Sequence, residues 1–422
     1  MPEEAAARVL ADAVFYRTSL RAAAERFFTL RPELDYLKPV VRVLTLGVAR
    51  NYILLDHALE RLGYGPPSHS YKWMLLRVLA YEVMVGGKYK RSRIEKLAPK
   101  AGAKPEDILS LRDVQPRDLV KGLPRPDRLS ILYSFPRWII EELLEASIPR
   151  LEELLKTLNQ DPVRWIRVAP GVDVNQLAKR LRDQGVVIEP DQDLPDTARI
   201  VDGASKATRT EEYRRGLYTL QDKASILVSH ILEPRGARVG DVTAGAAVKA
   251  SHMAWLGAVY VTAGDIKVER LYEALRVLDR LHARHVVDVY AADARRTPLR
   301  TLDRVLVDPP CTDVGRLQYE PEVKMWITRG ELKFFSRLQY QILKRIIEWA
   351  KPGTRIVYSV CTLTASETIK IIRRVLREDS MVDEEEPPIR LGDRIPGLPS
   401  SQRLYPHVHS TQGFFITVLR KL

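Results

Sequence analysis

Two short apolar runs in the second half of the chain stand out in its hydrophobic pattern. The first covers residues 304–307 and leads into Asp-Pro-Pro-Cys at 308–311, and the second covers 355–360 and leads into Cys-Thr at 361–362. Each run is short and β-branched, which is typical of a buried parallel strand with a functional loop at its carboxyl end. Between them, residues 331–349 have helical apolar spacing. A right-handed strand–helix–strand crossover would place both loops at one edge of a sheet.

The same alternation of strands and helices begins well before these runs. It predicts an open, mostly parallel sheet with helices on both faces. The further strands are expected at 238–242, 259–262, 286–290 and 413–419, and the further helices at 225–232 and 268–283.

The amino-terminal part of the chain has a different pattern. Residues 1–145 show helical apolar spacing without a strand signal, which predicts an all-α domain. Residues 146–205 contain two strand-like runs around one helical run, which predicts a small α/β subdomain similar to an RRM. Residues 206–422 then form the larger α/β domain. The length of 422 residues agrees with two or three domains.

Composition narrows the class of protein. Hydrophobic residues make up 45% and charged residues 29%, which is typical of a globular chain. No run approaches the ~20 apolar residues of a membrane span, and residues 1–8 lack the apolar core of a secretory signal. We therefore expect a cytoplasmic protein without a membrane partner. The net charge of +13 favours an anionic partner, nucleic acid first.

The positive charge is concentrated between residues 72 and 104. This stretch contains nine Lys or Arg residues and only two Glu residues, so its net charge is +7. A solvated helix face would explain such a run, but its density favours a surface that contacts RNA phosphates. The candidate RNA-binding residues in it are Lys88, Lys90, Arg91 and Arg93.

Cys311 and Cys361 are the only cysteines of the chain. Two buried thiols that act as small hydrophobes would be one interpretation, and a disulfide another, although a reducing cytosol disfavours it. Because both cysteines follow predicted strands and Asp308 and two prolines accompany Cys311, we favour a catalytic pair.

Four acidic residues follow successive predicted strands: Asp241, Asp265, Asp293 and Asp308. Each alone could be a helix cap. Ligands of open α/β sheets bind at the carboxyl ends of the strands, so four acids in series suggest a ligand with a ribose and an adenine amino group. The chain lacks a G-x-G-x-x-G turn here, which disfavours a dinucleotide.

These residues resemble the RNA cytosine-5 methyltransferases of the NOP2/Sun family, in particular the bacterial rRNA type with an amino-terminal NusB-like domain. The two-cysteine pattern is the specific part of the resemblance. The motifs that carry it are Trp138, 216–222, Gly264-Asp265, 308–311, 358–362 with Glu367, 403–407 and Gly413-Phe414-Phe415.

The resemblance implies a Rossmann-like methyltransferase domain over 206–422, a NusB-like RNA-binding domain over 1–145, and S-adenosylmethionine as cofactor. By position, Asp265 would hold the ribose hydroxyls, Asp293 the adenine amino group, and the loop 243–249 would pass under the methionine portion. The implied cofactor-binding residues are Thr243, Ala244, Gly245, Lys249, Asp265, Arg270, Asp293 and Asp308. The expected substrate is rRNA or tRNA, bound by a monomer, and no metal ion is expected.

The resemblance also assigns roles to the catalytic residues Cys361, Cys311 and Asp308. Carbon 5 of cytosine is too weak a nucleophile to take a methyl group unaided, and a thiolate that adds to carbon 6 activates it. Cys361 would be this nucleophile, and Cys311 would assist its release. Asp308 could donate to ring N3 when protonated, or accept from the N4 amino group when ionised.

Two alternative functions stay open. Asp308-Pro309-Pro310 also resembles the acid-Pro-Pro-aromatic loop of adenine-N6 methyltransferases, but Cys311 stands at the aromatic position. The loop 243–249 departs from its family, which has a proline and two glycines before the lysine, and Val248 precedes Lys249 here. An RNA-binding or ribosome-assembly factor with a decayed cofactor loop is therefore the second alternative.

Overall fold

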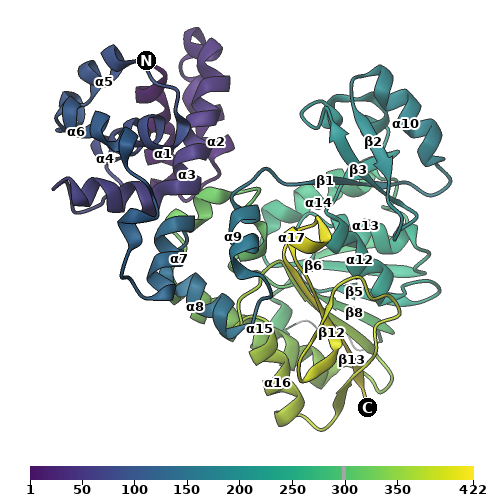
Figure 1. Ribbon diagram of the computed structural model, residues 1–422. Helices are drawn as coiled ribbons and strands as arrows, with labels where there is room; N and C mark the ends of the chain where they lie inside the picture. The colour runs from purple at the N-terminus through teal and green to yellow at the C-terminus, as the bar shows by residue number, and fades with distance from the viewer. Residues whose placement is uncertain (297–300) are drawn as a thin grey trace. The chain divides into compact units, whose positions relative to one another are not determined.

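The computed structural model describes residues 1–296 and 301–422, which form two compact units (Figure 1). The helical unit comprises Met1–Asp161 and Arg316–Arg329, and the sheet unit comprises Pro162–Gly315 and Gly330–Leu422. No helix among the described residues is long and apolar enough to cross a membrane.

The first 161 residues form helices without a strand, as the apolar spacing of residues 1–145 predicts. The α-helices are α1 (Pro2–Phe15), α2 (Leu20–Thr29), α3 (Lys38–Arg61), α4 (Tyr71–Tyr81), α5 (Arg91–Leu97), α6 (Pro105–Ser110), α7 (Arg125–Tyr133), α8 (Arg137–Glu145) and α9 (Leu151–Leu158). Short 3-10 segments lie at Pro32–Leu37, Pro99–Ala101, Leu111–Asp113 and Asp118–Val120, and a π-helical turn at Glu82–Gly86 follows α4.

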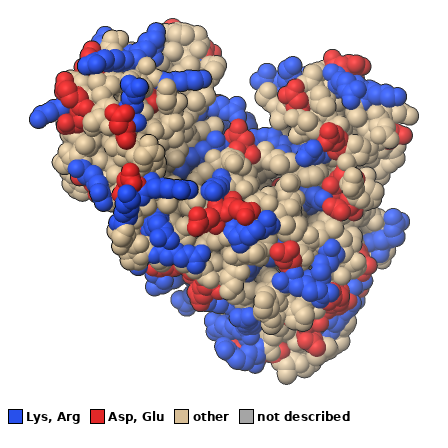
Figure 2. All heavy atoms as spheres, viewed as in Figure 1, with Lys and Arg blue, Asp and Glu red and all other residues tan. Residues whose placement is uncertain are grey.

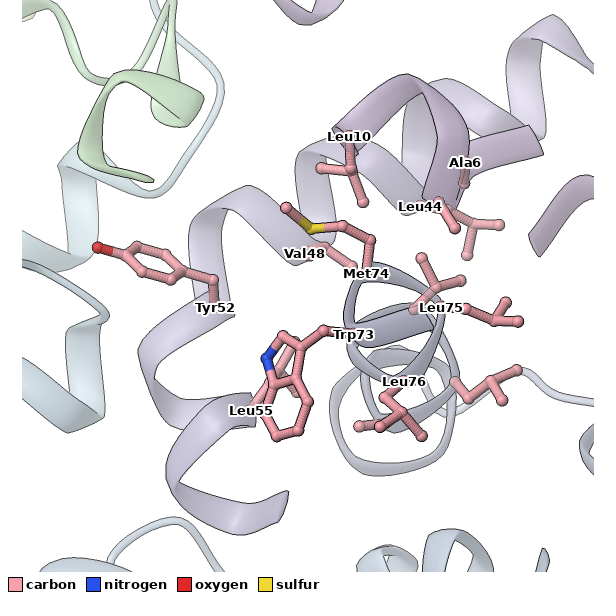
Figure 3. Packing of buried hydrophobic residues seen from close by; sticks show 14 of the residues in the cluster. Ala6, Leu10, Leu44, Val48, Tyr52, Leu55, Trp73, Met74, Leu75 and Leu76 are labelled. Carbon is pink, nitrogen blue, oxygen red and sulfur yellow. The ribbon is translucent and has the colours of Figure 1, made fainter. Parts of the chain in front are cut away.

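Helix α4 lies at the centre of the core of the helical unit. Figure 3 shows Trp73, Met74 and Leu75 packed among apolar side chains of α1 and α3. Trp73 also donates its indole N–H to Asp56 at 2.8 Å, and the buried Arg77 pairs with the same carboxylate at 2.7 Å. Asp56 therefore supplies hydrogen-bond acceptors for the indole and guanidinium groups, which would otherwise be buried in the apolar core without partners.

A segment distant in sequence completes the helical unit. Residues 316–329 include the 3-10 helix η9 (Pro321–Met325), and the side chain of Met325 joins the helical core. Tyr52 donates its hydroxyl to the carbonyl of Lys324 at 2.8 Å, and Glu322 accepts the backbone N–H of Leu20 at 2.7 Å. The chain therefore runs from Cys311 into the helical unit within a few residues.

The sheet unit begins with a four-stranded antiparallel sheet in the order β2-β3-β1-β4, accompanied by α10 (Val174–Asp183). Its strands are β1 (Arg164–Val168), β2 (Val187–Pro190), β3 (Thr197–Asp202) and β4 (Tyr218–Leu220). The sequence pattern predicts that the small subdomain ends at residue 205, but its sheet also includes β4, which begins at Tyr218. Whether this sheet and the helical unit act as independent domains stays a prediction.

The main sheet has the strand order β11-β12-β13-β9-β8-β5-β6-β7, and β10 pairs with β13. The pairs from β9 to β7 are all parallel, whereas β13 runs antiparallel to β9. Its strands are β5 (Arg238–Asp241), β6 (Tyr260–Asp265), β7 (Val287–Ala291), β8 (Arg304–Val307), β9 (Arg355–Val360), β10 (Val382–Glu384), β11 (Asp393–Ile395), β12 (Leu398–Leu404) and β13 (Phe414–Lys421).

Strand order reverses between β5 and β8, because β6 and β7 extend the sheet on one side and β9 on the other. This is the topological switch point, where open α/β sheets bind ligands. The connecting helices are α12 (Lys223–Leu232), α13 (Val248–Trp255), α14 (Val268–Arg280), α15 (Arg329–Trp349) and α16 (Ile369–Glu378), with short helices α11 (Glu211–Arg214) and α17 (Pro406–His409). The mixed α/β architecture confirms the predicted Rossmann-like fold.

Candidate active site

The two cysteines meet at the carboxyl ends of β8 and β9. These strands are parallel neighbours, with Val307 paired to Tyr358, so the loops that follow them lie side by side. The Sγ atoms of Cys311 and Cys361 are 3.3 Å apart, and the two cysteines form no disulfide. Cys311 is buried, whereas Cys361 is partly exposed. The sequence predicts both thiols at one edge of the sheet, and in the structure they lie in contact at that edge.

Asp308 is held by three neighbours. Its Oδ2 accepts a hydrogen bond from Lys249 Nζ at 2.6 Å, and its Oδ1 accepts one from the Ser359 hydroxyl at 2.9 Å. Its backbone N–H donates to the Thr243 hydroxyl at 3.1 Å. Burial alone would lower the pKa of Lys249, but the Asp308 carboxylate outweighs burial and raises it. Both carboxylate oxygens of Asp308 accept hydrogen bonds here, which matches the acceptor role, the second of the two alternatives that the sequence leaves open.

A second acidic residue of the site, Asp313, lies beside the thiols. Its Oδ1 accepts from Cys361 Sγ at 3.0 Å and from Cys311 Sγ at 3.7 Å. The backbone of Asp313 has a φ of 56°, the left-handed conformation that Asp tolerates better than most residues. Sequence reasoning missed this residue, although its place two positions after Cys311 was a usable signal.

The side chain of Glu367 is hydrogen-bonded to both cysteine loops. Its buried carboxylate accepts the backbone N–H of Thr312 at 2.9 Å, the hydroxyl of Thr364 at 2.8 Å and the amide of Gln339 at 3.0 Å. The hydroxyls of Thr312 and Thr362 also donate to it. Burial raises the pKa of Glu367, and these hydrogen bonds act in the opposite direction. One side chain therefore fixes the loops after β8 and β9 relative to each other.

Two glycines allow the carboxyl-terminal part of the chain to approach these loops. Gly315 donates its N–H to the carbonyl of Cys361 at 3.1 Å and accepts the N–H of Gly413 at 2.9 Å. A Cβ atom at Gly315 would lie 1.9 Å from the Gly413 carbonyl oxygen, which no side chain permits. This close approach explains why a glycine precedes Phe414 and Phe415 in the final strand.

The residues expected to hold the cofactor lie along β5, β6 and β7. Asp265 ends β6 and accepts the backbone N–H groups of Gly245 at 3.0 Å and Lys267 at 2.8 Å. Asp293 follows β7 and pairs with Arg295 at 2.6 Å, and the hydrogen bond from Arg295 lowers the pKa of Asp293. Both carboxylates are partly exposed at the carboxyl edge of the sheet.

Asp241 differs from the other three acids. It ends β5 but is only 1% exposed, and burial raises its pKa to about 7. Its side chain is thus inside the sheet unit rather than at the rim with Asp265, Asp293 and Asp308. Strand position alone could not distinguish it from them.

The loop between β5 and α13 forms a tight turn. Ala244 donates its N–H to the Gly264 carbonyl at 2.8 Å, and Gly245 has a φ of 56°. This left-handed backbone favours glycine, and a Cβ atom at Gly245 would also lie 3.0 Å from the Arg270 guanidinium, which would have to shift slightly. Val248 is the first residue of α13 and its carbonyl accepts from Arg167 at 2.9 Å. The exposed acids at the rim and the glycine turn fit a nucleoside cofactor.

The candidate RNA-binding residues lie around α5 of the helical unit. Lys88, Lys90 and Arg91 are exposed, but Arg93 pairs with the fully buried Glu3 at 2.8 Å. Figure 2 shows Lys and Arg side chains over both units on this face, mixed with acidic residues. Arg91 also pairs with a carboxylate, that of Glu95 at 3.0 Å, but this pair is exposed, so Lys88, Lys90 and Arg91 stay accessible to an anionic ligand, whereas Arg93 is tied to a buried residue.

Comparisons with known proteins identify methyltransferases as similar proteins. Residues 229–420 match the family model for the 16S rRNA methyltransferase RsmB/F. A probable ribosomal RNA small subunit methyltransferase B of Bacillus subtilis is 25% identical over 92% of this chain and 91% of its own length. A human 28S rRNA (cytosine(4447)-C(5))-methyltransferase is 28% identical over 69% of this chain and 38% of its own length. The solved structure titled "Crystal Structure of PH0851" covers 100% of this chain and 99% of its own, with a TM-score of 0.80 and 23% identity.

The Rossmann-like sheet and the residues at its switch point define an S-adenosylmethionine-dependent methyltransferase. Residues 229–420, somewhat less than half of the chain, are similar to the methyltransferase domain of the RsmB/F family. The family resemblance expected from the two-cysteine motif is thereby confirmed.

Proposed function

We propose that the protein methylates carbon 5 of a cytosine in RNA, with Cys361 as the nucleophile. One observation carries the proposal: two thiols that form no disulfide lie 3.3 Å apart after β8 and β9, and the Asp308–Lys249 ion pair lies at the same edge of the sheet. Adenine-N6 chemistry gives no role to a second cysteine at this place. The RNA cytosine-C5 activity named for relatives supports the same reaction.

The chain's own residues divide the reaction between them. Cys361 is the more accessible thiol and lies near the Lys249 ammonium, which stabilises its thiolate for attack on carbon 6. Asp308, as a hydrogen-bond acceptor, orients the base through its N4 amino group. Asp265 and Asp293 would hold S-adenosylmethionine, which would supply the methyl group for carbon 5. A base must leave its stack to reach these residues, which favours single-stranded or looped RNA.

Cys311 has a different environment from Cys361. A hydrogen bond with Cys361 and burial both raise the pKa of Cys311 well above the usual thiol range. Cys311 therefore stays a thiol and can donate to the sulfur of Cys361 at 3.3 Å when that sulfur leaves the base. This arrangement supports a role in release rather than in attack.

Small-subunit rRNA is the first substrate to test, because the relative that covers nearly the whole chain is named for it. Activity in the cytoplasm as a monomer stays a prediction. The decisive assay incubates the protein with methyl-labelled S-adenosylmethionine and unmodified RNA. We expect label in the RNA, whereas RNA binding without label would favour a binding or assembly factor.

Asp265→Ala is expected to weaken S-adenosylmethionine binding by ~1.5–3 kcal/mol, about 10- to 150-fold, because a charged hydrogen bond to the ribose is lost. The variant also loses the acceptor for Gly245 N–H, so the loop after β5 loosens. Titration calorimetry measures the change. Asp265→Asn is the comparison variant: its one carbonyl oxygen keeps an acceptor for Gly245 N–H, while the charge and the second acceptor, which Lys267 N–H uses, are lost. Unchanged affinity in both variants would contradict the assignment.

Reversing the charge of Lys88, Lys90 and Arg91 to Glu is expected to weaken binding of many RNAs alike. Each lost phosphate contact lowers the slope of log affinity against log salt by about 0.7 for single strands. Filter binding across a salt series measures this slope. Arg93 is left unchanged because it pairs with the buried Glu3.

The control for this experiment reverses three other exposed basic residues of the helical unit, Lys121, Arg125 and Arg128. This control makes the same change in net charge and should alter the slope less. An affinity loss confined to one RNA sequence would show that the α5 surface reads bases rather than phosphates.

A further inference from the structure

Asp313 is the one carboxylate that contacts both thiols among the described residues. Its Oδ1 lies 3.0 Å from Cys361 Sγ, and the side chain is partly exposed. A carboxylate beside a nucleophilic sulfur disfavours the thiolate, because like charges repel. The Asp313 carboxylate therefore hinders the attack of Cys361 on carbon 6. We ask whether it promotes a later step of the reaction instead.

The reaction has a later step that needs a base at this position. When carbon 5 takes a methyl group, it still carries its original hydrogen, which must leave before the product is released. Sulfur and the methyl donor are both bulky, so they approach opposite faces of the ring. Addition of the methyl group therefore turns the C5–H bond toward the face that holds the sulfur. The base that removes this proton must lie beside Cys361 Sγ.

We propose that Asp313 is the general base that removes the proton from carbon 5 and so releases Cys361 from the methylated base. This inference rests on the proposed function. The C5–H bond breaks, its proton passes to the Asp313 carboxylate, and its electron pair forms the C5–C6 double bond. The C6–S bond then breaks, and its electron pair returns to Cys361 as a thiolate beside the Cys311 S–H group.

The surroundings disfavour the other candidates for this base. Cys311 is held as a thiol by its contact with Cys361 and by burial, so it is a poor acceptor. Asp308 is paired with Lys249 and accepts from Ser359. Glu367 is fully buried beneath the loops and saturated with donors. Asp313 alone combines contact with the nucleophile and access to solvent, through which it can lose the proton after each turnover.

The test uses the full chain and Asp313→Asn. Asn tolerates the left-handed backbone at this position as Asp does, so the variant should fold, and thermal unfolding checks this. RNA labelled with tritium at carbon 5 of cytosine reports breakage of the C5–H bond. Methyl-labelled S-adenosylmethionine reports methyl transfer, and a denaturing gel reports the covalent protein–RNA adduct.

In a single turnover, Asp313→Asn is expected to form the adduct and transfer the methyl group at least as fast as wild type. Tritium release should slow by ~10²–10⁴-fold, the usual contribution of a general base, and the methylated adduct should accumulate. Asp313→Glu should restore part of the release rate. A merely structural residue would instead slow attack and release together.

Two results would overturn the inference. Unchanged tritium release in Asp313→Asn would show that another group takes the proton, and equal slowing of attack and release would indicate a structural role. In either case the wild type still transfers methyl groups, so the proposed function stands. A wild type that incorporates no methyl group would instead contradict the proposed function itself.

Discussion

Replacing Cys361 with alanine is expected to abolish turnover and to leave no covalent RNA adduct. Cys311→Ala should behave differently, because attack and methyl transfer need only the sulfur of Cys361. Turnover should fall by ~10²–10⁴-fold as assisted release is lost, and a protein–RNA band resistant to denaturant should accumulate. Denaturing gels with labelled RNA separate these outcomes. The prediction follows from the unequal environments of two thiols only 3.3 Å apart.

Two patterns would contradict these roles. If both alanine variants kept activity in proportion to their folded fraction, the thiols would be structural. If the adduct accumulated only in Cys361→Ala, Cys311 would be the nucleophile and the assignment would be inverted. Serine at either position is a closer match in shape and serves as a second variant for each cysteine.

Glu367→Ala is expected to be the most damaging substitution of a residue that does not touch the substrate. Its buried carboxylate holds Thr312 on one cysteine loop and Thr362 and Thr364 on the other. Each buried donor left without a partner costs ~1–3 kcal/mol, so we expect a loss of about 3 kcal/mol or more in stability. Urea unfolding measures the change, and the yield of covalent adduct measures the loss of loop alignment.

Glu367→Gln is the closest variant in shape, and its effect should be intermediate, because the threonine hydroxyls can rotate to accept from the new amide. Glu378→Ala, at an exposed carboxylate paired with Tyr340 and Arg374, is the control and should change little. Wild-type stability and adduct yield in Glu367→Ala would show that the two loops hold their positions without this residue.

The sequence predicts the parts of the fold that alternate regularly. The strands that end at Asp308 and at Cys361 are short, apolar and β-branched, and this pattern survives in β8 and β9. The strands β10 to β12 escape the same reasoning because they are polar or short and lie at the antiparallel side of the sheet. β10 and β12 pair with β13, and β11 pairs with β12, so their place in the sheet depends on these neighbours more than on their own residues.

For the candidate site, too, the sequence predicts some residues and not others. Two cysteines after two strands identify the catalytic loops, because parallel neighbours end at one edge. The place of Asp313 beside Cys311 was a usable signal, but Gln339 is an ordinary polar residue of a helix, and only the folded chain brings it to Glu367. Likewise, the sequence of residues 316–329 does not predict that they complete the helical unit, because their hydrogen-bond partners lie 272 and 302 positions away in the chain.

One measurement tests the central claim most directly. Purified protein is incubated with S-adenosylmethionine and unmodified small-subunit rRNA, and the RNA is digested to nucleosides for mass spectrometry. The proposal predicts 5-methylcytidine at a defined site, and none with Cys361→Ala. Methyl groups found only on adenosine, or no methylated nucleoside with a folded wild-type protein, would contradict it.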